Sequence, residues 1–165
     1  MVVVTYTIIH FNDVQKSFSD LKTQIETKEI TDGQRAVNNT EQLPMMPVAT
    51  ELKILAKLEK FEKTTLYTRN TISLPYLATY CETNTKYLSY VINRFTEKDF
   101  NNYINELRIN YIIAKIRSEP KYLKYKIASL AEEAGFSSQS KFANAFKKVT
   151  DVSPSQFLQN QKNIT

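Results

Sequence analysis

The chain has 165 residues, enough for one ordinary domain with an appendage or for two very small domains that share a core, and too few for a large multidomain enzyme. Its 2 glycines and 5 prolines compare with about 11 and 8 expected from average usage, which favours a helical protein. The net charge of +5 is uneven, because residues 84–165 carry 13 Lys and Arg against 7 Asp and Glu, and residues 1–83 carry 9 against 10. We expect a polyanion as the partner of the basic half; a basic surface without a ligand is the alternative.

The side chains that commonly carry catalysis or bind metals are scarce. The single cysteine, Cys81, excludes an internal disulfide and a cysteine zinc cluster, and the single histidine, His10, excludes any site that needs two imidazoles. The acidic residues form no recognisable pair of general acid and base. We therefore expect no enzyme activity, no cofactor and no bound metal. The cysteine usage permits a reducing compartment, and we expect a cytoplasmic protein.

The first 48 residues are expected to form an N-terminal extension and linker. Residues 1–11 are apolar but shorter than the about 20 residues of a membrane span, so we expect no stable span in this chain. This segment fits a strand, a docking segment or the remnant of a lost membrane segment, and the whole chain fits a truncated or minimal form of a longer protein. Helical spacing then predicts one helix over 13–29, whose apolar stripe consists of Val14, Phe18, Leu21 and Ile25. This helix either dimerises the protein or docks locally. Residues 31–48 lack periodicity and collect Gly, Asn and Pro, as a linker does.

A helical region follows the boundary near residue 48. A helix near 50–64 is expected to face inward with Leu52, Leu55, Leu58 and Phe61. Two short amphipathic helices come next, separated by the polar residues 83–85. Because so short a connection forces the two helices to cross steeply, the spacing predicts a helix-turn-helix over 73–95. Its inward side chains are Leu74, Leu77, Ala78 and Cys81 on the first helix, and Leu88, Val91, Ile92 and Phe95 on the second.

The same pattern returns 53 to 54 residues later and predicts a second helix-turn-helix over 126–149. Ile127, Leu130, Ala131 and Ala134 repeat the first helix, and Phe142, Ala145, Phe146 and Val149 repeat the second. Tyr103 and Ile104 correspond to Phe157 and Leu158, so each copy includes the start of a following helix, the last of them expected over 154–162.

A long helix is expected between the two copies, over 99–118, with Asp99 as its cap and Glu119-Pro120 as its end. Its apolar side chains lie on two opposite sides, so both sides must be covered. One side contains Phe100, Tyr103, Ile104, Leu107, Tyr111 and Ala114, and the other contains Ile109, Ile112, Ile113 and Ile116. The helix is therefore predicted to belong to the cores of both units.

Residues 127–157, IASLAEEAGFSSQSKFANAFKKVTDVSPSQF, resemble the second helix-turn-helix and signature region of the AraC/XylS family of transcription regulators. The resemblance covers about residues 70–160 and is most specific at Gly135-Phe136-Ser137, at Phe142 and Phe146-Lys147-Lys148, and at residues 153–157. It implies an all-α, homeodomain-like fold in which a long shared helix joins two helix-turn-helix subdomains, within a DNA-binding domain over 49–165. Asp151 stands where the family most often has Gly, and Leu158 where it often has Arg; neither change should disrupt the fold.

Function depends on the side chains that the second helix of each unit presents outward. Polar groups there can read base edges in the major groove. The base-facing candidates are Lys86, Tyr87, Ser89, Tyr90, Asn93, Gln139, Ser140, Lys141 and Asn144. Phosphate contacts are expected from the side chains of Arg94, Lys147 and Lys148 and from backbone N–H groups near Thr85 and Ser138.

We therefore expect a regulator that binds double-stranded DNA sequence-specifically, with its two units in adjacent major grooves, and that activates or represses transcription. RNA polymerase is a further candidate partner. The alternative is a helical protein-interaction module that has lost DNA binding.

Overall fold

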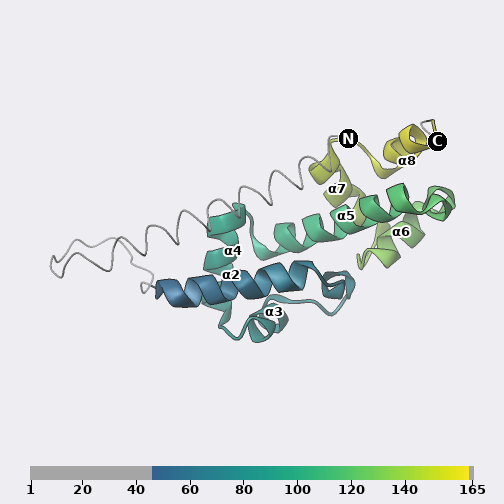
Figure 1. Cartoon of the computed structure of the whole chain (residues 1–165). Coiled ribbons are helices and arrows are strands. Elements are labelled where there is room, and N and C mark those ends of the chain that lie inside the picture. The colour runs from purple at the N-terminus through teal and green to yellow at the C-terminus, as the bar shows by residue number, and fades with distance from the viewer. Residues whose placement is uncertain (1–45, 164–165) are drawn as a thin grey trace. The chain divides into compact units, whose positions relative to one another are not determined.

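The computed structural model describes residues 46–163, which form helices and contain no strand. The all-helical class expected from the sequence is confirmed. The helix expected over 13–29 lies outside the described residues. The elements are α2 (Val48–Glu62), the 3-10 turn η1 (Leu66–Thr68), α3 (Leu74–Tyr80), α4 (Thr85–Thr96), α5 (Phe100–Ser118), the 3-10 turn η2 (Pro120–Lys124), α6 (Ile127–Glu133), α7 (Gln139–Thr150) and α8 (Pro154–Lys162) (Figure 1).

The duplication read from the sequence is also present in the backbone. α3 and α6 each have 7 residues, and α4 and α7 each have 12. α4 and α7 both end in a left-handed residue, Glu97 at φ 56° and Asp151 at φ 62°. The turn inside each unit also holds one left-handed residue, Glu82 at φ 55° and Gly135 at φ 80°. Asp151 thus supports the turn for which the family favours Gly, because Asp tolerates this conformation better than most residues.

Side-chain caps fix where five of these helices begin, and Ser73 is the cap of α3. The side chains of Asn84, Asp99 and Ser138 each accept a hydrogen bond from the backbone N–H three residues later, at 2.8, 2.7 and 3.3 Å. Ser153 and Gln156 form the expected capping box, in which each side chain bonds the other residue's backbone N–H. Each such cap stabilises the helix by about 1 kcal/mol, so the starts of α3, α4, α5, α7 and α8 are set locally.

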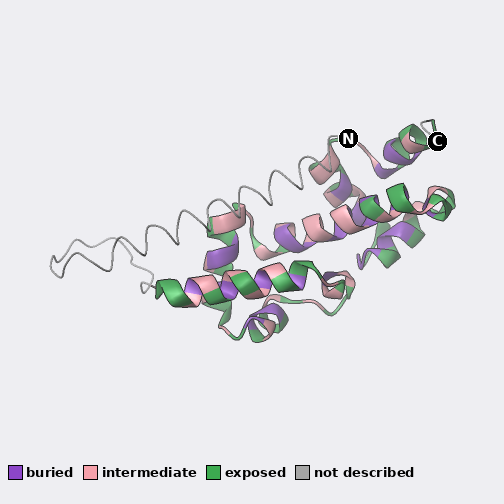
Figure 2. Cartoon of the chain, viewed as in Figure 1, coloured by how far each residue is buried: buried purple, intermediate pink, exposed green. Residues whose placement is uncertain are grey.

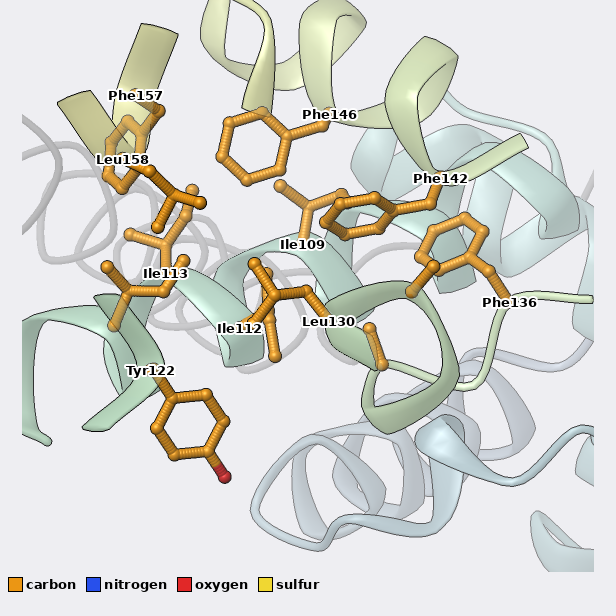
Figure 3. Close-up of a cluster of buried hydrophobic side chains, with 13 residues drawn as sticks. Ile109, Ile112, Ile113, Tyr122, Leu130, Phe136, Phe142, Phe146, Phe157 and Leu158 are labelled. Atoms are coloured by element: carbon orange, nitrogen blue, oxygen red, sulfur yellow. The ribbon is translucent and has the colours of Figure 1, made fainter. Parts of the chain in front are cut away.

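Two hydrophobic cores lie along α5, one for each unit. The first contains residues of α2, η1, α3, α4 and the first half of α5. The second contains residues of the later half of α5, η2, α6, α7 and α8, with Phe142 and Phe146 beside Ile109 (Figure 3). Burying a side chain of this size stabilises the fold by about 1.5–3 kcal/mol, so each unit has its own source of stability.

α5 contributes to both cores, as its two apolar sides predicted. Tyr103 and Ile104 are buried in the first core, and four isoleucines are buried in the second: Ile109, Ile112, Ile113 and Ile116. Tyr111 packs against both. Ala114, expected on the first side, is exposed instead, because the contacts of α5 with the first core end at Tyr111.

The buried face of α2 is rotated from the one expected. Buried positions recur along α2 among half-buried and exposed ones (Figure 2). Ile54, Leu58 and Phe61 are buried, whereas Leu52 and Leu55 are only half-buried. Glu51 lies on the buried face, and among residues 46–163 the only other buried charged side chain is Arg108 on α5. α2 has this orientation about its axis because its buried face packs against α4 and η1, which it contacts directly.

Candidate nucleic-acid interface

The first group of candidate residues lies on α4, on the side away from the first core. Thr85, Lys86, Ser89 and Asn93 are exposed. Tyr87 and Tyr90 are half-buried, with part of each ring packed against the core. The opposite side of α4 is buried through Leu88, Val91 and Ile92. The polar stripe of α4 is therefore accessible to a partner, and its two tyrosines are restrained by packing.

The second group lies on α7 and its N-cap. All seven candidates there are exposed: Ser138, Gln139, Ser140, Lys141, Asn144, Lys147 and Lys148. Phe142 and Phe146 are fully buried on the opposite side of the helix. Lys141 Nζ donates a hydrogen bond to Ser137 Oγ at 3.2 Å, which holds its ammonium near the start of α7. α7 thus presents amide, hydroxyl and ammonium groups to solvent along one face.

Arg94, near the end of α4, is held from two directions. Its Nη1 lies 3.0 Å from Glu51 Oε1 of α2 and donates to the Tyr90 hydroxyl at 3.0 Å. The contact with Glu51 is an ion pair whose angles are not those of a hydrogen bond, so this buried carboxylate oxygen has no hydrogen-bond donor among the described residues. The Arg94 side chain is still 48% exposed. Glu51 was not expected from the sequence, where an acidic residue in the first turn of a helix is typical of a solvent-facing position.

Lys148, near the end of α7, reaches the start of α5. Its Nζ donates to Asn102 Oδ1 at 2.8 Å, and Asn102 Nδ2 donates to Asp99 Oδ2 at 2.9 Å. The sequence singled out neither Asn102 nor this link, because 46 residues separate it from Lys148 and no spacing pattern connects them. The contact places a cation of the second unit beside the helix junction that follows α4.

The turn of the first unit carries a neutralised carboxylate. Glu82, between α3 and α4, is bonded by Lys53 Nζ at 2.8 Å and by Lys57 Nζ at 2.7 Å. These lysine hydrogen bonds and charges lower the pKa of Glu82 to about 2. Because an unpaired carboxylate would repel a phosphate backbone, the two lysines of α2 reduce the repulsion that a nucleic acid would meet at this turn.

Within residues 46–163, no three His, Cys, Asp or Glu side chains gather where they could bind a metal ion. None of the helices described combines the length and the hydropathy that crossing a membrane requires.

Comparison with known proteins identifies the domain type. A family model described as a helix-turn-helix domain matches residues 77–160. The fold is similar to the C-terminal domain of AraT, a response regulator from Geobacillus stearothermophilus, with a TM-score of 0.53 and 20% identity over 73% of this chain and 88% of that one. It is also similar to a transcriptional regulator with an AraC-type DNA-binding domain from Chromobacterium violaceum, with a TM-score of 0.55 and 16% identity over 70% and 96%.

A third similar structure is the C-terminal domain of the two-component response regulator yesN from Fusobacterium nucleatum, with a TM-score of 0.50 and 23% identity over 68% of this chain and 99% of that one. No curated protein matches the sequence. At these identities the structural likeness establishes the fold, and the family model establishes the type of domain.

Proposed function

The chain belongs to the AraC/XylS family of helix-turn-helix proteins, and from this membership we propose that it is a transcription regulator that binds double-stranded DNA with α4 and α7 in adjacent major grooves. One observation carries the proposal: the same three-helix arrangement occurs twice, and both times its second helix exposes a polar face. In a helix-turn-helix, that second helix is the one that enters the major groove.

The proposed base contacts follow from the chemistry of the exposed faces. Asn93, Gln139 and Asn144 each carry an amide that can bond adenine at two positions. Lys86 and Lys141 can donate to guanine, and Ser89 and Ser140 can bond several bases. Tyr87 and Tyr90 can place ring edges against thymine methyl groups, and their partial burial reduces the conformational entropy that binding would cost.

The proposed phosphate contacts lie at the ends of the same helices. Lys147 and Lys148 carry charge at the end of α7, and Arg94 does so at the end of α4. Arg94 keeps guanidinium N–H groups beyond the one that faces Glu51 and Tyr90, so an anion can still be bound there. Backbone N–H groups near Thr85 and Ser138 point out of the helix starts, where a phosphate is favoured.

The length of α5 bears on the shape of the bound DNA. Its 19 residues extend about 28 Å at 1.5 Å per residue, less than the roughly 34 Å between successive major grooves on one face of straight B-DNA. We propose that the duplex bends toward the protein so that both grooves are reached, at a cost of about 1–6 kcal/mol that the added contacts offset.

Further parts of the proposal concern the rest of the chain. Residues 49–165 form the DNA-binding domain, and residues 1–48 an N-terminal extension. We propose that the protein acts in the cytoplasm, without catalytic activity and without a cofactor. RNA polymerase is proposed as a partner of the DNA-bound form.

Selection of bound duplexes from a random pool tests the function. We expect one enriched site with two short half-sites, and binding to that site should weaken steeply with salt because phosphate contacts release counterions. Gln139→Ala should alter the recovered sequence, whereas Gln159→Ala, which changes an exposed glutamine of α8 outside the candidate face, should not. A pool without enrichment would refute sequence-specific DNA binding and favour a protein partner.

A further inference from the structure

The two units meet at the segment that connects α2 to α3. Arg108, in the middle of α5, reaches this segment and donates through Nε to the Tyr67 carbonyl at 2.7 Å and through Nη2 to the Arg69 carbonyl at 2.9 Å. Because these acceptors are backbone atoms, the bonds fix the path of the chain itself and do not depend on which side chains stand at 67 and 69.

The turn of the second unit touches the same segment from another side. Gly135, between α6 and α7, has φ +80°, and a Cβ atom placed on it would lie 1.8 Å from the Thr68 carbonyl oxygen and 2.5 Å from the Thr68 carbonyl carbon. Since these are backbone atoms, they cannot move aside as a flexible side chain would. Only glycine allows the turn of the second unit to approach the first unit this closely.

The Arg108 guanidinium also faces the second core. Its carbon lies 5.4 Å from the centroid of the Phe136 ring, a cation-π arrangement. Tyr67 belongs to the first core and Phe136 to the second, so one side chain contacts both. The residue is 9% exposed, and this burial lowers the pKa of its guanidinium.

Burying this charge is costly, which limits the roles it can have. Its two hydrogen-bond acceptors are neutral carbonyls, and neutral partners offset the desolvation of a cation less than a carboxylate does. An apolar residue of similar size would serve the packing of α5 at a lower cost. What an apolar residue cannot do is bond two carbonyls of the first unit while facing an aromatic ring of the second.

We infer that Arg108 is a positioning residue that sets the orientation of the two helix-turn-helix units, and thereby selects the spacing between the two half-sites that the protein accepts. Only the part about half-site spacing rests on the proposed function, because the orientation of the two units is a property of the protein alone. Arg108 acts through the carbonyls of Tyr67 and Arg69 and the ring of Phe136, and not through contact with DNA.

The variant that tests the inference is Arg108→Met, which keeps an unbranched apolar chain and removes both hydrogen bonds. Arg117→Met is the matched control, because Arg117 is an arginine of the same helix that stacks at 5.9 Å on Phe157 of α8, within the second unit. Arg108→Lys keeps the charge but replaces the planar donor with a single ammonium, and it serves if the methionine variant does not fold.

Distance measurement between spin labels tests the orientation without DNA. Lys60→Cys on α2 and Asn160→Cys on α8 place labels on exposed positions of the two units. The natural Cys81 is fully buried and its pKa is raised to about 11 by burial, so it does not compete for labelling at neutral pH. We expect a broader distance distribution for Arg108→Met and Arg108→Lys than for the parent, and an unchanged one for Arg117→Met. Equal widths in all four proteins would overturn the inference.

Binding to a series of duplexes tests the consequence for specificity. The selected half-sites are placed at their natural spacing and at spacings one base pair shorter or longer. We expect Arg108→Met to reduce the preference for the natural spacing by about tenfold, a change of about 1.4 kcal/mol, while affinity for a single half-site stays as in Arg117→Met. A simple loss of folding would lower both together. Broadened distances without DNA binding by any of the proteins would refute the proposed function and leave the positioning role intact, whereas DNA binding with unchanged spacing preference would refute the role in specificity.

Discussion

The sharpest test of the contact between the two units is Gly135→Ala. This change adds one methyl group at a position where the backbone has φ +80° and where the added atom would stand 1.8 Å from the Thr68 carbonyl oxygen. Two separate costs arise. An L-residue in a left-handed conformation costs about 1–2 kcal/mol, and moving packed backbone to make room costs about 1–3 kcal/mol more.

The expected loss in the free energy of unfolding is therefore about 2–5 kcal/mol, a large share of the roughly 5–15 kcal/mol that holds a typical domain together. The positive φ angle of residue 135 does not by itself account for the larger part of this loss in the free energy of unfolding. Glu82, the counterpart of Gly135 in the first unit, has φ 55° and is an ordinary L-residue. At Gly135 the carbonyl oxygen of Thr68 stands where the added Cβ atom would lie, and this contact adds to the cost of the φ angle.

Urea unfolding followed by far-UV circular dichroism measures this loss directly. Glu97→Ala is the control, because it exchanges one L-residue for another at φ 56° on an exposed site and should change the free energy of unfolding by less than about 0.5 kcal/mol. If Gly135→Ala lowers the free energy of unfolding by no more than the about 1–2 kcal/mol that the φ angle alone costs, the close approach of the two units is wrong.

Three further predictions concern DNA binding and acid stability. Asn144→Ala should relax base preference at one position of the site, whereas Lys148→Ala should weaken binding to all sequences and reduce the salt slope by about 1; equal losses on specific and random duplexes for both variants would contradict this division. Circular-permutation electrophoresis should show a bent complex, and unbent mobility would remove the bending proposal. The pKa of Glu82 is lowered to about 2, so its ion pairs with Lys53 and Lys57 stabilise the fold above pH 4.5 and are lost as pH falls toward 2. Glu82→Gln should therefore flatten acid unfolding over that interval, and an unchanged acid profile would contradict it.

Most of the fold could be predicted from sequence patterns that involve only neighbouring residues. Apolar spacing identified α3, α4, α6 and α7, because each is a short amphipathic helix whose inner residues are all hydrophobic. Asp99 and Ser153 were recognised as caps from residue type alone, and both accept the expected backbone hydrogen bonds. Such features depend on neighbours within four residues, which the sequence shows directly.

The expectations that were wrong have a different cause, because each concerns a position whose burial depends on residues distant in sequence. Ala114 lies on the predicted apolar side of α5 but beyond the first core, and the extent of that core follows from tertiary packing. The buried face of α2 contains Glu51 and Ile54 in place of Leu52 and Leu55. Glu51 can lie there because Arg94 of α4 forms an ion pair with its carboxylate.

Arg108 was missed because a charged residue in a helix is ordinarily expected at the surface. One signal was present: Arg108 stands between Ile104 and Ile112 at spacings of four, inside a buried stripe. Its acceptors, 39 and 41 residues away, leave no trace in local pattern. The exposed polar faces of the candidate site can be predicted from the sequence, because the hydrophobic spacing of a helix shows which residues point inward and therefore which point outward. The contacts of Arg94 and Lys148 with other helices could be seen only in the structure.

Hydroxyl-radical footprinting of the protein on its selected duplex tests the central claim most directly, because it maps backbone protection along both strands. Two units in adjacent major grooves should leave two protected patches centred about one helical turn, roughly 10 base pairs, apart on one face of the DNA. Protection confined to a single groove, or two patches on opposite faces, would contradict the account.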